Sequence, residues 1–81
     1  KPLNNMKLNT INVLEAPSGF PNQLTAFPDT KEGNAAAEEK FKELVRIVGD
    51  EQITDEELNE IVGDGYFCNE NWDELFLIHS S

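Results

Sequence analysis

The stretch from Ala35 to Val48 constrains the fold most strongly, because it is the one segment periodic enough to bury a continuous apolar stripe by itself. Its apolar residues recur at the spacing of one face of an α-helix. They are Ala37, Phe41, Leu44, Val45 and Val48. Glutamate, lysine and arginine occupy most of the other positions after Ala37. The pattern predicts a helix that packs on an apolar surface supplied by the rest of the chain.

Residues on either side of this stretch set the expected ends of the helix. Asp29 or Thr30 can cap its start, although Gly33 weakens the first turn, and an alternative start places the cap at Asn34. Gly49 is predicted to end the helix, because glycine is the usual residue just past a helix C-terminus.

A second helix has the clearest start signal in the chain. Thr54 is followed three residues later by Glu57, which is a capping box, and Ile53 before the cap can pack on Leu58 as a hydrophobic staple. The run Gly63-Asp64-Gly65 then stops the helix. These signals predict a short acidic helix.

Extended segments flank the two helices. Residues 7–15 and 23–28 are separated by a turn-forming segment with two prolines and a glycine, so they predict a first β-hairpin. Residues 66–68 and about 72–79 surround Asn69-Glu70-Asn71 and predict a second hairpin. The expected fold is α+β, in which two β-hairpins form a small antiparallel sheet with two helices packed on one face. The element order is strand-strand-helix-helix-strand-strand.

The length of 81 residues allows one domain, which we assign to residues 7–81. Residues 1–6 carry no pattern and are expected to be a disordered or tag-like N-terminus. The single cysteine cannot form an internal disulfide, and the sequence has no apolar run of the length needed for a secretory signal or a membrane span. The expected location is the cytoplasm.

The net charge of -10 makes the surface strongly anionic. Such a surface disfavours direct contact with nucleic acid phosphates and with anionic membranes, and it favours a basic protein partner. No lysine or arginine follows Arg46, so the acids are concentrated in the second half of the chain. One interpretation is a solvated surface whose acids complement the dipole of the second helix. The other is a surface that competes for a basic groove, with contacts from Asp55, Glu56, Glu57, Glu60 and Asp64.

The final strand is apolar on both of its faces. Trp72, Phe76 and Ile78 alternate with Leu75 and Leu77, whereas a two-layer domain covers only one face of its sheet. Either loops or the N-terminal residues cover the second face, or the face is a surface for self-association or a partner. In the self-association hypothesis the contact residues include Trp72, Leu75 and Leu77.

The sequence offers no set of residues for catalysis or metal binding. An EF-hand loop with Gly65 as its sixth residue would place Val62 at a ligand position, and valine cannot bind calcium. Cys68 and His79 are predicted to lie roughly 20 Å apart in the second hairpin, too far for a nucleophile and its base. We therefore expect no enzyme activity, no cofactor and no metal.

Two resemblances follow from these residues. Residues 53–65 (ITDEELNEIVGDG) resemble the end of double-glycine leaders of enzymatically modified peptides, which implies cleavage after Gly65, although Asp64 separates the two glycines. The wider layout, with FPDTKEG before the first helix, a short ITDEEL helix and a closing hairpin that ends in LIHS, resembles small uncharacterised acidic proteins of phages and bacteria. That resemblance implies an accessory or host-interaction protein.

Three functional hypotheses result. The first is a small acidic protein-protein interaction module, such as a phage-type accessory or inhibitor protein, that binds a basic host protein surface. The second is a structural protein that forms homodimers through the outer face of its last strand. The third is the precursor of a modified peptide.

Overall fold

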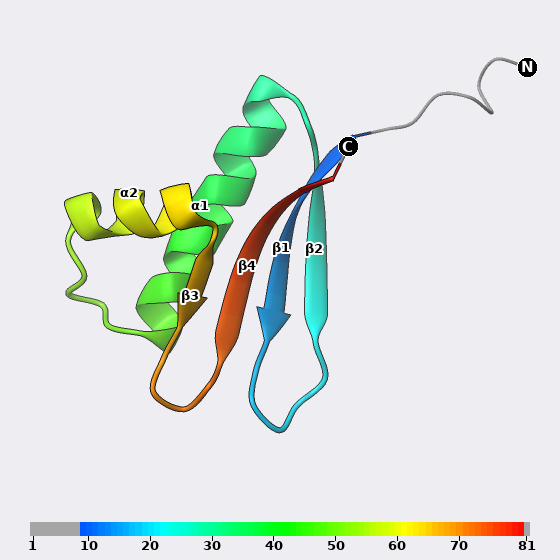
Figure 1. Cartoon of the computed structure of the whole chain (residues 1–81). Helices are drawn as coiled ribbons and strands as arrows, with labels where there is room; N and C mark the ends of the chain where they lie inside the picture. Colours follow the sequence, from blue (N-terminus) through cyan, green and yellow to red (C-terminus); the bar gives the residue numbers. More distant parts are fainter. Residues whose placement is uncertain (1–8, 81) are drawn as a thin grey trace, which may run out of the picture.

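The computed structural model describes residues 9–80 and contains four strands and two helices (Figure 1). Their bounds are β1 (Thr10–Ala16), β2 (Gln23–Pro28), α1 (Lys31–Val48), α2 (Asp55–Asp64), β3 (Tyr66–Cys68) and β4 (Glu74–Ser80). The predicted α+β class and the order strand-strand-helix-helix-strand-strand are confirmed. The expectation for residues 1–6 lies outside the described residues.

The four strands form one antiparallel sheet in the order β2-β1-β4-β3. Both predicted hairpins are present, as the pairs β1–β2 and β3–β4. The sheet is completed by pairing of β1 with β4, in a register that runs from Thr10 opposite Ser80 to Ala16 opposite Glu74. The first and last strands of the chain therefore lie at the centre of the sheet.

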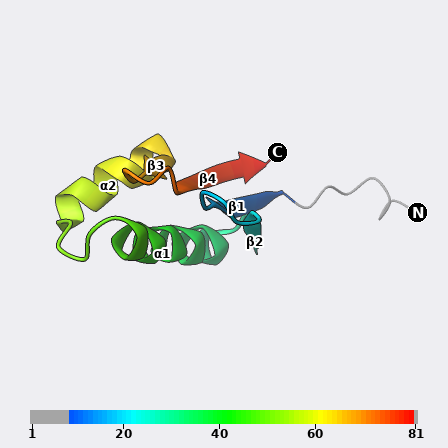
Figure 2. The ribbon, with the colours of Figure 1, turned by 90° about the horizontal axis from the view of Figure 1, so that it is seen from below.

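Helix α1 packs on one face of this sheet and forms the core with it (Figure 2). Phe41 and Val45 of α1 are fully buried, as are Ile11 and Val13 of β1. The predicted stripe is the side of α1 that faces the sheet, because four of its five residues are buried and Val48 is partly buried against them.

Thr30 caps α1, and its Oγ1 accepts a hydrogen bond from the backbone N–H of Gly33 at 3.0 Å. The alternative start at Asn34 is therefore wrong. Gly33 is buried against the end of β2, where a Cβ atom would collide with the carbonyl oxygen of Pro28. A residue that weakens the helix turn is thus the one that lets the chain pass from β2 into α1.

Helix α2 lies beside β3 and packs against α1 (Figure 2). The predicted capping box is present, with Thr54 and Glu57 as its members, and Leu58 is buried in the core. Gly65 ends the helix in the left-handed conformation, with φ of 68°. Its N–H donates to the carbonyl oxygens of Ile61 and Val62.

The opposite face of the sheet carries no helix within residues 9–80, as the view along the layers shows (Figure 2). In the same part of the chain, neither helix has the length and apolar character needed to cross a bilayer.

Candidate functional site

The alternation of side chains along β4 separates core residues from residues on the side of the sheet that carries no helix in the described part of the chain. Leu75 is only 2% exposed, and Leu77 is half-buried against the same core. The prediction that Leu75 and Leu77 lie on an outer contact surface is therefore wrong. Because α1 covers the side of the central strand β4 to which these residues point, Phe76 and Ile78 point to the uncovered side.

A row of large apolar side chains crosses all four strands on this uncovered side. Leu24 of β2 lies opposite Leu14 of β1, Leu14 lies opposite Phe76 of β4, and Phe76 lies opposite Tyr66 of β3. The Tyr66 and Phe76 rings are in contact, with centroids 5.1 Å apart. Leu24 is 61% exposed, and Ile78 beside the row is 42% exposed. We call this side of the sheet the open face.

The rest of the open face is almost free of charge. Its other strand residues are Thr10, Asn12, Ala16, Ala26, Pro28, Cys68, Glu74 and Ile78. Glu74 is thus the one acid there, out of 16 in the chain, and no lysine or arginine is present among the described strand residues of this face. The Tyr66 hydroxyl donates to Oε2 of Glu74 at 2.7 Å, and this hydrogen bond raises the pKa of Tyr66. An apolar, neutral surface thus lies on a strongly anionic molecule.

The sequence predicts part of the open face but not all of it. The alternation along the last strand places Phe76 and Ile78 on one side, but no pattern in the sequence connects Leu14, Leu24 and Tyr66 with them. The signal in the sequence for Leu14 is its position next to Val13 in a strand, where neighbouring side chains point to opposite faces. Single exposed leucines are common in proteins, so the pattern becomes informative only when the register aligns four strands.

Two of the five acids that were predicted to contact a partner have roles inside the fold. Oδ1 of Asp55 accepts a hydrogen bond from Nη2 of Arg46 at 3.1 Å, which is a salt bridge between α2 and α1. Glu57 accepts hydrogen bonds from the backbone N–H and the hydroxyl of Thr54, and these bonds lower the pKa of Glu57. Asp55 and Glu57 thus each have a role within the fold, and because both remain exposed on α2, their contact with a partner stays a prediction.

The other three acids predicted to contact a partner, Glu56, Glu60 and Asp64, are exposed on α2. None of them lines the hollow between α1 and α2 or either of two further hollows of the described surface. Their role in binding a basic partner stays a prediction.

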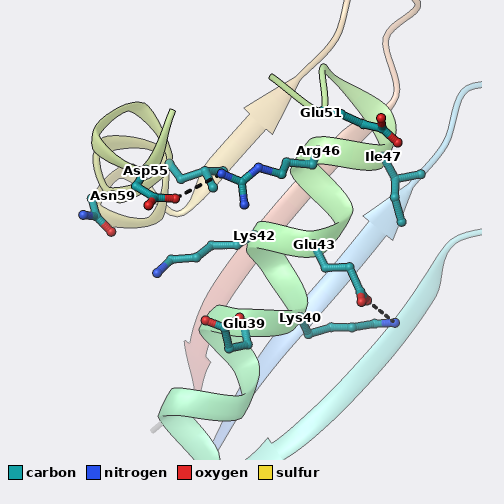
Figure 3. Close-up of a pocket in the computed structure, with 10 residues that line it drawn as sticks. Glu39, Lys40, Lys42, Glu43, Arg46, Ile47, Glu51, Asp55 and Asn59 are labelled. Carbon is teal, nitrogen blue, oxygen red and sulfur yellow. Dashed lines mark hydrogen bonds and ion pairs between the residues drawn. The ribbon is translucent and has the colours of Figure 1, made fainter. Parts of the chain in front are cut away.

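A hollow of the described surface lies between α1 and α2 (Figure 3). Arg46 is at its centre, where Nη2 donates to the carbonyl oxygen of Ile53 at 3.0 Å as well as to Asp55. Lys42 points into the space between the helices, and Lys40 pairs with Glu43 at 3.9 Å. Carboxylates and cations alternate along this hollow, so it attracts neither anionic nor cationic ligands strongly. The contacts of Arg46 in it hold α2 on α1.

Trp72 lies in the turn between β3 and β4, because β4 begins only at Glu74 and not at Trp72 as predicted. It is 72% exposed and has a positive φ of 64°. Asn69 supports this turn through Oδ1, which accepts hydrogen bonds from the N–H groups of Asn71 and Asp73. Trp72 is therefore at the end of the sheet and not in the apolar row.

Cys68 and His79 do not come together. Cys68 lies opposite Glu74 at one end of β4, and His79 is five residues further along the same strand, which is about 17 Å. Among residues 9–80, no group of three or more histidine, cysteine or acidic side chains is placed to hold a metal ion.

Comparisons with known protein families, with curated proteins and with solved structures found no match to this chain.

Proposed function

We propose that this protein is a protein-protein interaction module that binds its partner through the open face of the sheet. The observation that supports this most is the apolar row of Leu24, Leu14, Phe76 and Tyr66 on a face that carries a single acid. The four strands present about 350 Å² of flat sheet, at about 3.3 Å per residue and 4.8 Å between strands. The whole face is comparable in area to the largest apolar patch of a typical folded monomer, and such patches are often functional.

The evidence that α2 binds a basic protein is weaker than the evidence that the open face binds a partner. Asp55 and Glu57 already have hydrogen-bond partners in the packing and capping of α2, so these two exposed acids have an explanation without a binding partner. Exposed acids are also the ordinary surface of a protein with this composition. Binding of a basic host protein, as in the small phage and bacterial proteins that the chain resembles, therefore remains a prediction beside the proposal.

A modified-peptide precursor fits the fold poorly. Cleavage after Gly65 would remove β3 and β4, and with them Leu75 of the core. The segment after Gly65 is thus an integral part of the sheet.

Site-specific photo-crosslinking in cells that naturally make the protein tests the proposal. A photoreactive phenylalanine analogue at Leu24 places the probe on the open face, and the same analogue at Ile47 places it on the exposed surface of α1. Both positions hold large exposed apolar residues, so they are a matched pair. We expect a covalent adduct from position 24 and none from position 47. Adducts from neither position, or from position 47 alone, would contradict the proposal.

A further inference from the structure

We infer that the partner at the open face is a second copy of this chain, so that two sheets stack face to face with the helices on the outside. This inference rests on the proposed function and names the partner for the same surface. Two sheets stack at a separation of about 10 Å when both inner faces are apolar. The dimer would then have the layer order helix, sheet, sheet, helix.

The charge distribution supports a second copy over a charged partner. A basic partner would be matched by acids on the face and an acidic partner by cations. Among the described strand residues of the open face, however, Glu74 is the one charged group, and it already accepts a hydrogen bond from Tyr66. A twofold axis brings only the residues close to it near their own copies, so charges of one sign at the axis would repel each other. The chain has a net charge of -10 but keeps 15 of its 16 acids off this face, since Glu74 is the one acid there. The open face is therefore suited to meet itself.

The position of the large side chains supports the same arrangement. Leu14 and Phe76 belong to the two central strands, β1 and β4, so a twofold axis through the middle of the sheet passes close to both. Small residues, Ala16 and Ala26, stand on the same face and leave room for large side chains of the opposite copy. Leu24 and Ile78, which are well exposed in the monomer, become covered by this packing.

The area of the open face limits how tightly two copies are expected to associate. Two copies cover about twice 350 Å² of flat sheet. Because side chains protrude from the sheet, the buried surface is larger than this and comes near the lower limit of about 1,000 Å² for specific interfaces. Each copy also adds its charge of -10 to the dimer, so repulsion opposes association. We therefore expect a weak, reversible dimer.

Sedimentation equilibrium of the full chain tests the inference. The measurement covers about 1 to 500 µM protein at about 50 mM and about 500 mM NaCl, because salt screens the repulsion between the two anionic copies. We expect a monomer–dimer equilibrium whose dissociation constant falls roughly threefold or more at the higher salt concentration. Binding of a basic partner would show the opposite salt dependence, because there salt screens an attraction.

Lysine substitutions locate the interface. Leu24→Lys and Ile78→Lys each place a charge twice in the dimer interface, and we expect each to raise the dissociation constant by at least about tenfold. Ile47→Lys adds the same positive charge on α1 and should leave the dissociation constant unchanged or slightly lower. Circular dichroism confirms that each variant is folded, and the two open-face positions serve as independent replicates of the test.

Two results would show that the open face does not form a dimer. A monomer at all concentrations and both salt levels overturns the inference, and so does a dimer that both open-face variants leave intact. If the photo-crosslinked adduct from position 24 then contains another protein, or residues 1–8 of the same chain, the open face has a different occupant. If position 24 gives no adduct at all, the proposed function fails as well.

Discussion

The backbone N–H of Leu77 donates a hydrogen bond to the carbonyl oxygen of Gly65, with nitrogen and oxygen 2.9 Å apart. This bond ties the end of α2 to the central strand β4. Gly65 is in the left-handed conformation, and a Cβ atom on it would lie 2.9 Å from the carbonyl oxygen of Leu77. The residue after α2 is therefore restricted twice, by its φ angle and by the neighbouring backbone.

Gly65→Ala should lower the free energy of unfolding by about 1 to 3 kcal/mol, because alanine is strained at positive φ and its Cβ meets a backbone atom. Urea denaturation measures the change. Gly63→Ala is the matched control, because it lies inside α2 and an added Cβ there meets nothing within 4 Å. The control should raise stability by about 0.5 to 1 kcal/mol through helix propensity. Equal effects of the two substitutions would contradict this account of Gly65.

Gly33→Ala should destabilise the protein although it replaces glycine inside a helix. Helix propensity alone favours alanine by about 1 kcal/mol, but the new Cβ would collide with the carbonyl oxygen of Pro28. Relief of that collision requires a backbone shift, so we expect a net loss of about 1 to 3 kcal/mol. Urea denaturation of this variant and of Gly63→Ala in parallel separates the effect of helix propensity from the effect of the collision. Stabilisation by Gly33→Ala would show that the end of β2 moves away freely.

Leu75→Ala should cost about 2 to 5 kcal/mol of unfolding free energy, because it opens a cavity in the core. Leu24→Ala removes the same atoms from an exposed position and should cost less than about 1 kcal/mol in the monomer. Denaturation at low protein concentration makes the comparison. A small effect of Leu75→Ala would mean that the assignment of the two faces of β4 is reversed.

Asp73 should give the protein an acid-sensitive contribution to stability. Hydrogen bonds from the Asn69 side chain and the Ser18 backbone N–H lower the pKa of Asp73. Because the folded-state pKa lies below the unfolded-state value, this contribution is present above the unfolded-state pKa. It is lost as the pH falls through the folded-state pKa.

The difference in unfolding free energy between wild type and Asp73→Asn should therefore be largest near neutral pH and should shrink at acidic pH. Urea titrations across this range measure it. Glu70→Gln removes one negative charge from the same turn and serves as the control, because Glu70 is exposed. A constant difference across the pH range would exclude a stabilising role for ionised Asp73.

Local signals predicted the elements of the fold well. The stripe of α1 and the capping box of α2 are encoded by residues a few positions apart, and both hairpins are closed by short turns. The pairing of β1 with β4 was not predicted, because it joins strands at opposite ends of the chain. Loop closure over such a distance leaves no short-range pattern in the sequence.

The candidate site was predicted less well for a related reason. Leu75 with Leu77 and Phe76 with Ile78 are equally apolar pairs, so hydrophobicity cannot decide which pair faces the helices. Only the register of β4 against β1 decides it, since Val13 and Leu77 are directly opposite and share the covered side. A one-residue shift in register exchanges the core with the surface.

The pairing of Thr10 with Ser80 has a mechanical consequence. The described ends of the chain leave the sheet side by side, so a pulling force applied between them acts across the β1–β4 ladder and breaks its hydrogen bonds one after another. The centre of the molecule would open before its edges do. Tension on this protein would therefore separate the two hairpins first. Ile11 would be exposed early, then Val13, and Leu75 only near the end of this separation.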